Sequence, residues 1–315
     1  MPAELPVTVR IATRASQLAL WQAQHISDLL TFAVPELNVE IVHVSTTGDR
    51  VQTTALSEFG GVGVFTREVQ HALLDGRADI AVHSLKDLPT EPTAGLTLAA
   101  VPRREVRFDA LVLPATARHA ITDVMQLPPE ARIGTGSLRR QAQLRHLRPD
   151  LRVEEVRGNV DTRLKKLDAG EYDALILAAA GLTRLGWGDR ITTRLEPPVM
   201  FPAVGQGAIG IECRANDSSV IHLLSRLTDQ TAWTEVTAER SLLAALRAGC
   251  HAPLGVLTHH VGNALQLEAV VLSPDGTQRW SVTASLPADR AVELGREVAR
   301  QLVAQGVDAV LHQPK

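Results

Sequence analysis

The 315-residue sequence predicts an α/β fold with two units of similar size, followed by a small C-terminal α+β domain. Short apolar runs alternate with amphipathic helical segments in the first part of the chain, which is typical of a mostly parallel sheet covered by helices. The same alternation begins again near residue 131. From about residue 233 the order changes to one helix, three strands and a final helix, which is typical of a separate small domain.

The first unit is expected to contain four strands and two helices. Its first helix is expected over residues 17–30, because Leu18, Trp21 and Ile26 fall near one stripe of the helical surface. A second helix is expected to be capped by Thr66 and to stop near residue 76, where Asp and Gly interrupt the pattern. The strands are expected over residues 7–12, 39–44, 79–83 and 96–101, and a glycine-rich loop is expected over residues 56–64.

The remaining elements follow from the same criteria of periodicity and turn residues. In the second unit, strands are expected over residues 131–134, 151–156 and 174–179, helices over 137–147 and 161–167, and a proline-bearing connection over 195–204. In the last domain, helices are expected over residues 233–247 and 288–306, and strands over 254–259, 265–273 and 278–284.

Composition argues against several classes of function. A net charge of −3 and only 3% aromatic residues are unlike a nucleic-acid binder, which needs positive charge and stacking side chains. The two cysteines make no disulfide framework, and no Cys/His cluster has metal-ligand spacing. The first residues do not resemble a signal peptide, and no apolar run reaches the roughly 18 residues of a membrane span. We therefore expect a cytoplasmic protein with no metal, nucleic acid or membrane partner.

Cationic side chains follow the predicted strands of both units. Because ligands of open α/β sheets bind beyond the carboxyl ends of the strands, these cations are candidates for an anion site in a cleft between the units. Predicted helix starts at Ser16, Ser137 and Asp161 would add backbone N–H donors. No phosphate-binding Gly-x-x-x-x-Gly-Lys-Ser/Thr loop is present, so a ligand with many carboxylates is favoured over phosphate. The seven cations are Arg14, Lys86, Arg139, Arg140, Arg157, Arg163 and Arg184.

Two further residues indicate chemistry rather than binding alone. Cys250 lies between Gly249 and Pro253, so its thiol is expected on a turn that an electrophile can reach. Asp87 follows a predicted strand and shares the cationic region, where nearby positive charge would keep it ionised. Such a carboxylate can stabilise a developing cation or transfer protons, although a salt bridge to an arginine is the simpler alternative.

Two motif-like patterns are rejected. The stretch from Gly205 to Gly210 matches Gly-x-Gly-x-x-Gly, but Pro202 lies just upstream and residues 209–213 read as a strand instead of a helix. A dinucleotide-binding fingerprint requires a strand before it and a helix after it. The pair His259-His260 has no third ligand nearby in sequence and is interpreted as the end of a strand.

Several longer segments occur together along nearly the whole chain. They are residues 10–14 (RIATR), 18–22 (LALWQ), 78–87 (ADIAVHSLKD), 137–141 (SLRRQ), 157–160 (RGNV), 203–207 (AVGQG), and Gly249-Cys250 with Pro253. In this order and spacing they resemble the porphobilinogen deaminase family, whose members are also called hydroxymethylbilane synthases.

The resemblance implies a fold of three domains. The first two would be α/β domains of the type II periplasmic-binding-protein kind, and the third a small α+β domain with the cysteine loop. The boundaries expected on this basis are residues 5–104 together with 206–228, residues 105–205, and residues 229–315.

The resemblance also implies an activity and its residues. Family members build the linear tetrapyrrole hydroxymethylbilane stepwise from porphobilinogen, with release of ammonia, in porphyrin and heme biosynthesis, and precedent favours a monomer. A dipyrromethane cofactor would be attached through a thioether to Cys250, and Asp87 would be the catalytic aspartate. The residues expected to bind cofactor and substrate are Arg14, Ser16, Gln22, Ser84, Lys86, Thr135, Ser137, Arg139, Arg140, Arg157, Asn159, Arg163, Arg184 and Gln206.

A binding protein for acidic ligands is the main alternative, because a two-lobed fold alone fits it equally well. That alternative predicts no covalent adduct and gives Cys250 and Asp87 no role. The chain also departs from the family pattern, without loss of a residue assigned to chemistry, at Thr47, Val62, Gly136, Asp161 and Ala248.

Overall fold

The computed structural model describes residues 5–45, 66–116, 121–249 and 252–311, which form two compact units. Unit 1 consists of residues up to Glu105 together with Ala208–Trp233, and unit 2 of Val106–Gly207 together with the chain from Thr234 onward. The C-terminal region thus groups with the second sheet, and the division into three domains stays a prediction. The expected glycine-rich loop, Thr47, Val62 and Cys250 lie outside the described residues.

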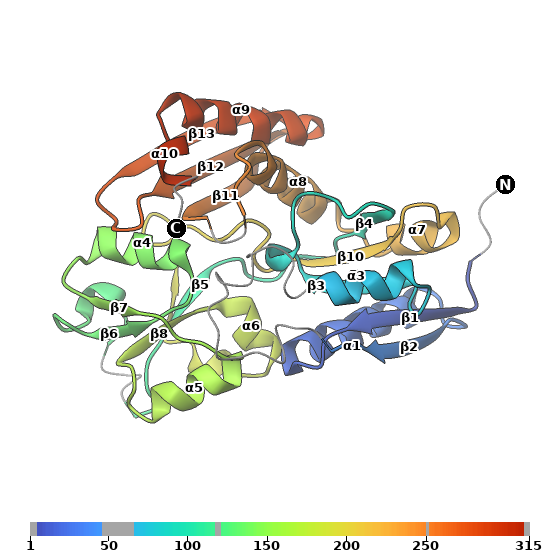
Figure 1. Ribbon diagram of the computed structural model, residues 1–315, viewed down its shortest axis with the longest axis horizontal. Helices are drawn as coiled ribbons and strands as arrows, with labels where there is room; N and C mark the ends of the chain where they lie inside the picture. The colour runs from blue at the N-terminus through green and yellow to red at the C-terminus, as the bar shows by residue number, and fades with distance from the viewer. Residues whose placement is uncertain (1–4, 46–65, 117–120, 250–251, 312–315) are drawn as a thin grey trace. The chain divides into compact units, whose positions relative to one another are not determined.

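Unit 1 is built on a five-stranded sheet with the order β2-β1-β3-β10-β4 (Figure 1). Strands β1, β2 and β3 are parallel, whereas β10 runs antiparallel to both β3 and β4. Strand β4 therefore runs in the same direction as β1, β2 and β3, and the expected mostly parallel sheet is confirmed, with β10 as its one reversed strand. The strands are β1 (Thr8–Thr13), β2 (Asn38–His43), β3 (Ile80–Ser84), β4 (Leu96–Ala100) and β10 (Ile209–Arg214).

Side-chain alternation along these strands places helices on both faces of the sheet. Val9 and Ile11 of β1 point to one face, where they pack with helices α1 and α7. Ala12 points to the other face and packs with Val69 and Leu73 of α3. The helices are α1 (Gln17–Ala33), α3 (Arg67–Leu74) and α7 (Ser218–Ser225), the last of which the sequence analysis missed.

Unit 2 contains a second five-stranded sheet, with the order β7-β6-β8-β5-β9. Strands β6, β7 and β8 are parallel, and β5 runs antiparallel to both of its neighbours, β8 and β9, so four of the five strands run in one direction. The parallel strands β6, β7 and β8 were expected, whereas β5 and β9 were not. The elements are β5 (Asp109–Val112), β6 (Arg132–Gly134), α4 (Leu138–Leu147), β7 (Arg152–Glu154), α5 (Val160–Asp168), β8 (Ala174–Ala178), α6 (Ala179–Arg184) and β9 (Thr193–Leu195).

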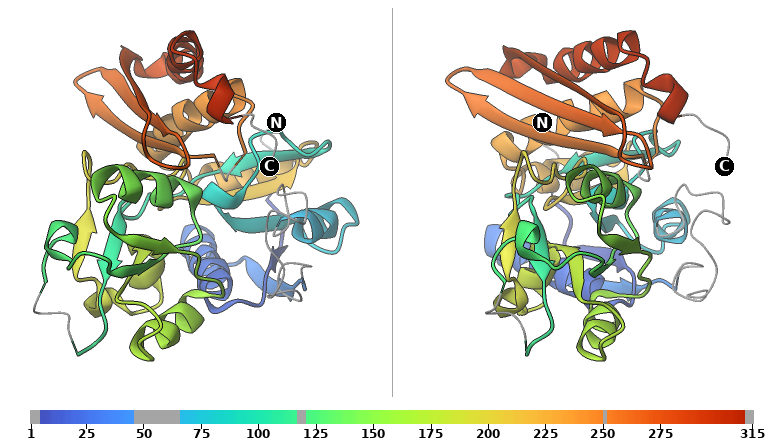
Figure 2. Two further views of the ribbon diagram at one scale, coloured as in Figure 1. Left: turned by 60° about the vertical axis from the view of Figure 1, so that its left-hand side comes forward. Right: turned by 90° about the vertical axis from the view of Figure 1, so that its left-hand side faces the viewer.

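The last part of the chain has the predicted order of one helix, three strands and a helix. The strands form an antiparallel sheet, β11-β12-β13, and α9 lies along one face of it (Figure 2). The final helix begins three residues later than expected, because Ala288–Arg290 form a 3-10 turn. The elements are α8 (Gln230–Ala245), β11 (Leu254–Val261), β12 (Ala264–Leu272), β13 (Arg279–Pro287), α9 (Ala291–Ala304) and α10 (Asp308–Leu311).

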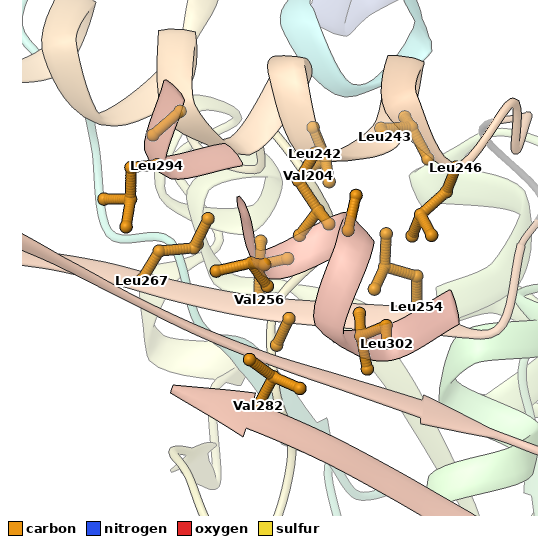
Figure 3. Packing of buried hydrophobic residues seen from close by; sticks show 14 of the residues in the cluster. Val204, Leu242, Leu243, Leu246, Leu254, Val256, Leu267, Val282, Leu294 and Leu302 are labelled. Atoms are coloured by element: carbon orange, nitrogen blue, oxygen red, sulfur yellow. The ribbon is translucent and has the colours of Figure 1, made fainter. Parts of the chain in front are cut away.

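The core of this domain is aliphatic and lies between its helices and its sheet. Leu242 of α8 and Leu294 of α9 pack over Val256 and Leu267 of the sheet (Figure 3). The opposite face of β12 is also covered, since Val270 and Leu272 pack against Ala142 of α4. Within unit 2, the C-terminal region is therefore joined to the second sheet by buried apolar contacts.

The structure places the two rejected motifs at strands β10 and β11. Gly205 and Gly207 both have positive φ, and the chain then enters strand β10, as the sequence predicted. The paired histidines, His259 and His260, lie in β11. Both residues are exposed, and their backbone pairs with β12. Within the described ranges, no helix is long and apolar enough to cross a membrane and no cluster of three potential metal ligands occurs.

Candidate active site

The predicted residues of unit 1 follow two neighbouring parallel strands. Strands β1 and β3 pair in parallel, so the segments after Thr13 and Ser84 leave the sheet at the same edge. Arg14 and Ser16 follow β1, and Ser16 caps helix α1 by accepting a hydrogen bond from the Ala19 amide (3.4 Å). This edge carries the residues of unit 1 that were expected to bind carboxylates.

Gln22 links helix α1 to the end of β3. It is buried on α1, and its Nε2 atom lies 2.9 Å from the Ser84 hydroxyl oxygen. The hydroxyl can in turn donate to Gln22 Oε1 at 3.3 Å. The pair therefore fixes the position at which the chain turns away from β3.

Asp87 lies in the single 3-10 turn that follows β3, Leu85–Asp87. Leu85 and Leu88 are buried on either side of it, at 1% and 4% exposure. The Leu85 amide donates to the Ala208 carbonyl oxygen, and the Leu88 amide donates to the Leu85 carbonyl oxygen. This anchoring leaves the Asp87 side chain exposed and that of Lys86 half-buried. A carboxylate held on a fixed turn beside a lysine can exchange protons with a bound molecule.

In unit 2, a buried polar cluster surrounds Asp109, a residue that the sequence did not single out. Its carboxylate is fully buried at the start of β5 and accepts from Arg139 Nη1 (2.7 Å) and Arg140 Nη2 (2.7 Å). Gln206 Nε2 donates to the same carboxylate at 2.9 Å. Three predicted binding residues are thus held together by one buried acid.

The charges of this cluster determine the ionisation of Asp109. Burial alone would raise its pKa, but the guanidinium groups of Arg139 and Arg140, with the hydrogen bond from Gln206, hold the pKa of Asp109 well below its usual range. The carboxylate is therefore ionised at every pH at which the protein would work. Burial lowers the pKa of Arg139, against the raising effect of Asp109, yet an arginine stays charged in proteins.

Other predicted residues of unit 2 lie at the ends of its parallel strands. Thr135 is buried after β6, and its carbonyl oxygen accepts from Gln141 Nε2 (3.0 Å). Ser137 and Asn159 occupy the positions before α4 and α5, without capping bonds from their side chains. Helix N-termini of this kind offer backbone N–H groups to an anion.

The remaining arginines of unit 2 already make contacts. Arg157 forms an ion pair with Glu155 (3.0 Å), and Arg163 donates to the Gly158 carbonyl oxygen (2.8 Å). Arg184 is buried at the end of α6 and donates to the Gly207 carbonyl oxygen (2.7 Å). These cations follow β7 and β8, as expected, while part of their hydrogen-bonding capacity is used within unit 2.

Structural acids were the main class of polar residue that sequence reasoning missed. Asp79 holds Arg10 (2.9 Å) and Arg214 (3.0 Å) at the start of β3, and the buried Glu239 accepts from the Gly205 amide (2.7 Å). Their partners are far away in sequence, so no local spacing could have revealed these pairs. The fully buried Asp109 is of the same kind.

Two family models match most of the chain. One, described as "Porphobilinogen deaminase, dipyromethane cofactor binding domain", matches residues 9–222, and the other, "Porphobilinogen deaminase, C-terminal domain", matches residues 233–304. A curated porphobilinogen deaminase from Syntrophomonas wolfei is 44% identical over 303 residues, which cover 96% of this chain and 97% of that protein.

Solved structures show more distant similarity. The methionine-binding protein MetQ is 11% identical with a TM-score of 0.44, and covers 73% of this chain and 95% of its own. The effector-binding domain of BenM with benzoate is 18% identical with a TM-score of 0.42, and covers 76% and 94% respectively. The two family models and the relative that is 44% identical show that the chain belongs to the porphobilinogen deaminase family.

Proposed function

We propose that this protein polymerises porphobilinogen into the linear tetrapyrrole hydroxymethylbilane with the residues placed above. The observation that carries the proposal is the match to both family models, which together include the segments bearing Asp87, the arginines and Cys250. The reaction belongs to porphyrin and heme biosynthesis. The monomeric state, the cytoplasmic location and the lack of nucleic-acid or membrane partners stay predictions.

The buried cluster around Asp109 suits a ligand that carries carboxylates. Two guanidinium groups face one carboxylate, so these three side chains carry a net formal charge of +1. The Nε atom of Arg139 is buried and finds no hydrogen-bond partner among the described residues. Buried charge and buried donors without partners are costly, and an incoming carboxylate would compensate both. Each pyrrole of a dipyrromethane or a growing chain bears an acetate and a propionate, so the residues present fit this group.

Carboxylates of the chain would be bound by arginines at the strand ends of unit 2, namely Arg139, Arg140, Arg157, Arg163 and Arg184, with Gln206. Thr135, Ser137 and Asn159 would assist with hydroxyl, amide and backbone donors. In unit 1, Arg14, Lys86, Ser16, Ser84 and Gln22 would bind the carboxylates of porphobilinogen or of the chain end. Arginine suits this task because its planar fork donates two parallel hydrogen bonds to a carboxylate.

Asp87 would act on the reacting atoms. Loss of ammonia from porphobilinogen leaves a cationic azafulvene, whose charge the Asp87 carboxylate would stabilise. When bound, the dipyrromethane supplies the nucleophilic pyrrole carbon. Formation of the new carbon–carbon bond leaves one proton to be removed from that carbon, and Asp87 would accept it. The position of Asp87 on an anchored turn supports both roles, since Leu85 and Leu88 hold the turn in the core.

Cys250 is the residue we assign to attachment of the cofactor. The other cysteine, Cys213, lies fully buried in β10, and burial raises the pKa of its thiol to about 11. A thiol reacts as the thiolate, so Cys213 would be both unreachable and protonated at neutral pH. That leaves Cys250, on the segment between α8 and β11, as the thiol suited to form a thioether.

The reaction itself provides the direct test of this function. Incubation of the purified protein with porphobilinogen should release one ammonia for each porphobilinogen consumed and yield a linear tetrapyrrole. Ammonia is measured enzymatically and the tetrapyrrole by its absorbance after cyclisation and oxidation. Saturable binding of porphobilinogen without release of ammonia would instead favour a binding protein for acidic ligands.

A further inference from the structure

The buried acid Asp109 accepts hydrogen bonds from Arg139, Arg140 and Gln206, a cluster that no feature of the sequence indicated. Its Oδ2 atom accepts from Arg139 Nη1, while its Oδ1 atom accepts from Arg140 Nε (2.9 Å), Arg140 Nη2 (2.7 Å) and Gln206 Nε2 (2.9 Å). The Asp109 side chain is 0% exposed, and those of Arg139 and Arg140 are 4% and 7% exposed. All four residues therefore hold fixed positions, because charged hydrogen bonds are strong away from water.

A second set of contacts holds Arg139 from another side. Its Nη1 atom also donates to the Phe201 carbonyl oxygen. Gln143, one helical turn further along α4, holds Phe201 in place through two hydrogen bonds. Its Nε2 atom donates to the Phe201 carbonyl oxygen (3.2 Å), and its Oε1 atom accepts from the Phe201 amide (2.7 Å). Gln143 is itself 5% exposed. The direction of the Arg139 guanidinium is thus set by a carboxylate and by a carbonyl that Gln143 holds in place.

Arg139 and Arg140 differ in how many of their hydrogen-bond donors have partners. Arg140 donates from Nε and Nη2 to Asp109 and from Nη1 to the Ile176 carbonyl oxygen (3.0 Å). Arg139 donates from Nη1 to Asp109 and to the Phe201 carbonyl oxygen, and its buried Nε finds no partner within the described part of the chain. Arg139 is therefore the member of the pair whose guanidinium is oriented while one donor, Nε, still lacks a hydrogen-bond partner in the described residues.

We propose that Asp109 is a positioning residue of this enzyme, with Gln143 as its second support: together they hold the Arg139 guanidinium in the direction in which it binds a carboxylate of the cofactor or growing chain. The inference rests on the proposed function. Asp109 would not touch the ligand itself. It would fix the arginine before the ligand arrives, so that less freedom is lost when the carboxylate binds.

The first test replaces Asp109 by asparagine, which keeps the shape and removes the charge. We expect the fraction of purified chains that carry the dipyrromethane, measured by intact mass, to fall by about tenfold, as suits loss of one oriented charged hydrogen bond. In the chains that are loaded, KM for porphobilinogen should rise by about tenfold, with kcat changed by less than about threefold, because binding would be weakened alike in ground and transition states. An unchanged loaded fraction with unchanged KM would overturn the proposal.

A second variant covers the case in which Asp109→Asn does not fold, because removal of one partner leaves buried charge unpaired. Gln143→Met keeps the length of the side chain and introduces no charge, and it releases the Phe201 carbonyl that orients Arg139. It should lower loading and raise KM in the same direction as Asp109→Asn, by about two- to fivefold. Normal loading and normal KM in this folded variant would also contradict the proposal.

The matched control is Asp79→Asn in unit 1. Asp79 is likewise a carboxylate held by two arginines, Arg10 and Arg214, and its side chain is 14% exposed. This variant should lose stability but keep its cofactor and its KM, which separates positioning from a general effect of a lost ion pair. Failure of the inference is distinct from failure of the proposed function: wild-type protein without the cofactor mass overturns the function, whereas loaded wild type beside an equally loaded Asp109→Asn overturns only the inference.

Discussion

Replacement of Asp87 by asparagine is expected to lower kcat by about 10²- to 10⁴-fold, the usual contribution of a positioned acid or base. The asparagine fills the same place on the turn Leu85–Asp87, whose anchors Leu85 and Leu88 are unchanged. It removes the negative charge that would stabilise the azafulvene and the oxygen that would take the departing proton. Because Asp87 is exposed, folding should be almost unaffected.

The measurement is steady-state release of ammonia from porphobilinogen, made on protein whose cofactor content has been determined by mass. Glu91→Gln is a suitable control, since Glu91 is an exposed acid four residues further along the chain. It should retain wild-type kcat. Near-normal turnover in Asp87→Asn with the cofactor in place would show that the roles assigned to Asp87 are wrong.

Replacement of Gly295 by alanine is expected to destabilise unit 2 by about 1–3 kcal/mol, the usual cost of overpacking. Gly295 lies in α9 where this helix meets α8, and an added Cβ would meet the Ala238 carbonyl oxygen and lie 2.6 Å from the Leu242 amide nitrogen. Both are backbone atoms of α8, which cannot move aside as a flexible side chain could. The two helices would have to separate, which would disturb the aliphatic core around Leu242 and Leu294.

Denaturant unfolding monitored by circular dichroism would measure the change. Gly188→Ala is the matched control, because Gly188 is exposed and an added Cβ there would meet nothing within 4 Å. Its effect should stay within about 0.5 kcal/mol. If Gly295→Ala were as stable as the wild type, the close approach of α8 and α9 would be contradicted. A large loss would also be expected to reduce cofactor content, since this domain bears the cysteine segment.

Elements with a clear apolar pattern could be predicted from the sequence, whereas β5 and α7 could not. The run Ile209–Arg214 was recognised as a strand in spite of its preceding glycine motif, because apolar residues and the upstream proline outweighed the glycine spacing. Strand β5 was missed because it begins with a buried charge, Asp109, which ordinary hydrophobic patterning counts as a surface residue. Its identity as a strand depends on pairing with β8, a contact that is distant in sequence.

The candidate site was predictable in position but not in detail. Parallel strands bring their carboxyl ends to one edge, so the residues after β6, β7 and β8 could be grouped from the sequence alone. The pairing of Arg139 with Asp109 spans 30 residues and could not be inferred from spacing. One departure from the family pattern also has a local reason: a Cβ at Gly136 would lie 3.1 Å from the Val156 carbonyl oxygen, so a serine would fit tightly there.

Intact mass of the purified native protein, beside that of Cys250→Ser, tests the central claim most directly. We predict that the native chain is heavier than its sequence by two linked pyrrole units and that this excess is absent from Cys250→Ser. That result would establish the cofactor and its point of attachment together. A native mass equal to that of the bare sequence, unchanged after incubation with porphobilinogen, would contradict the account and favour a protein that binds acidic ligands without a covalent adduct.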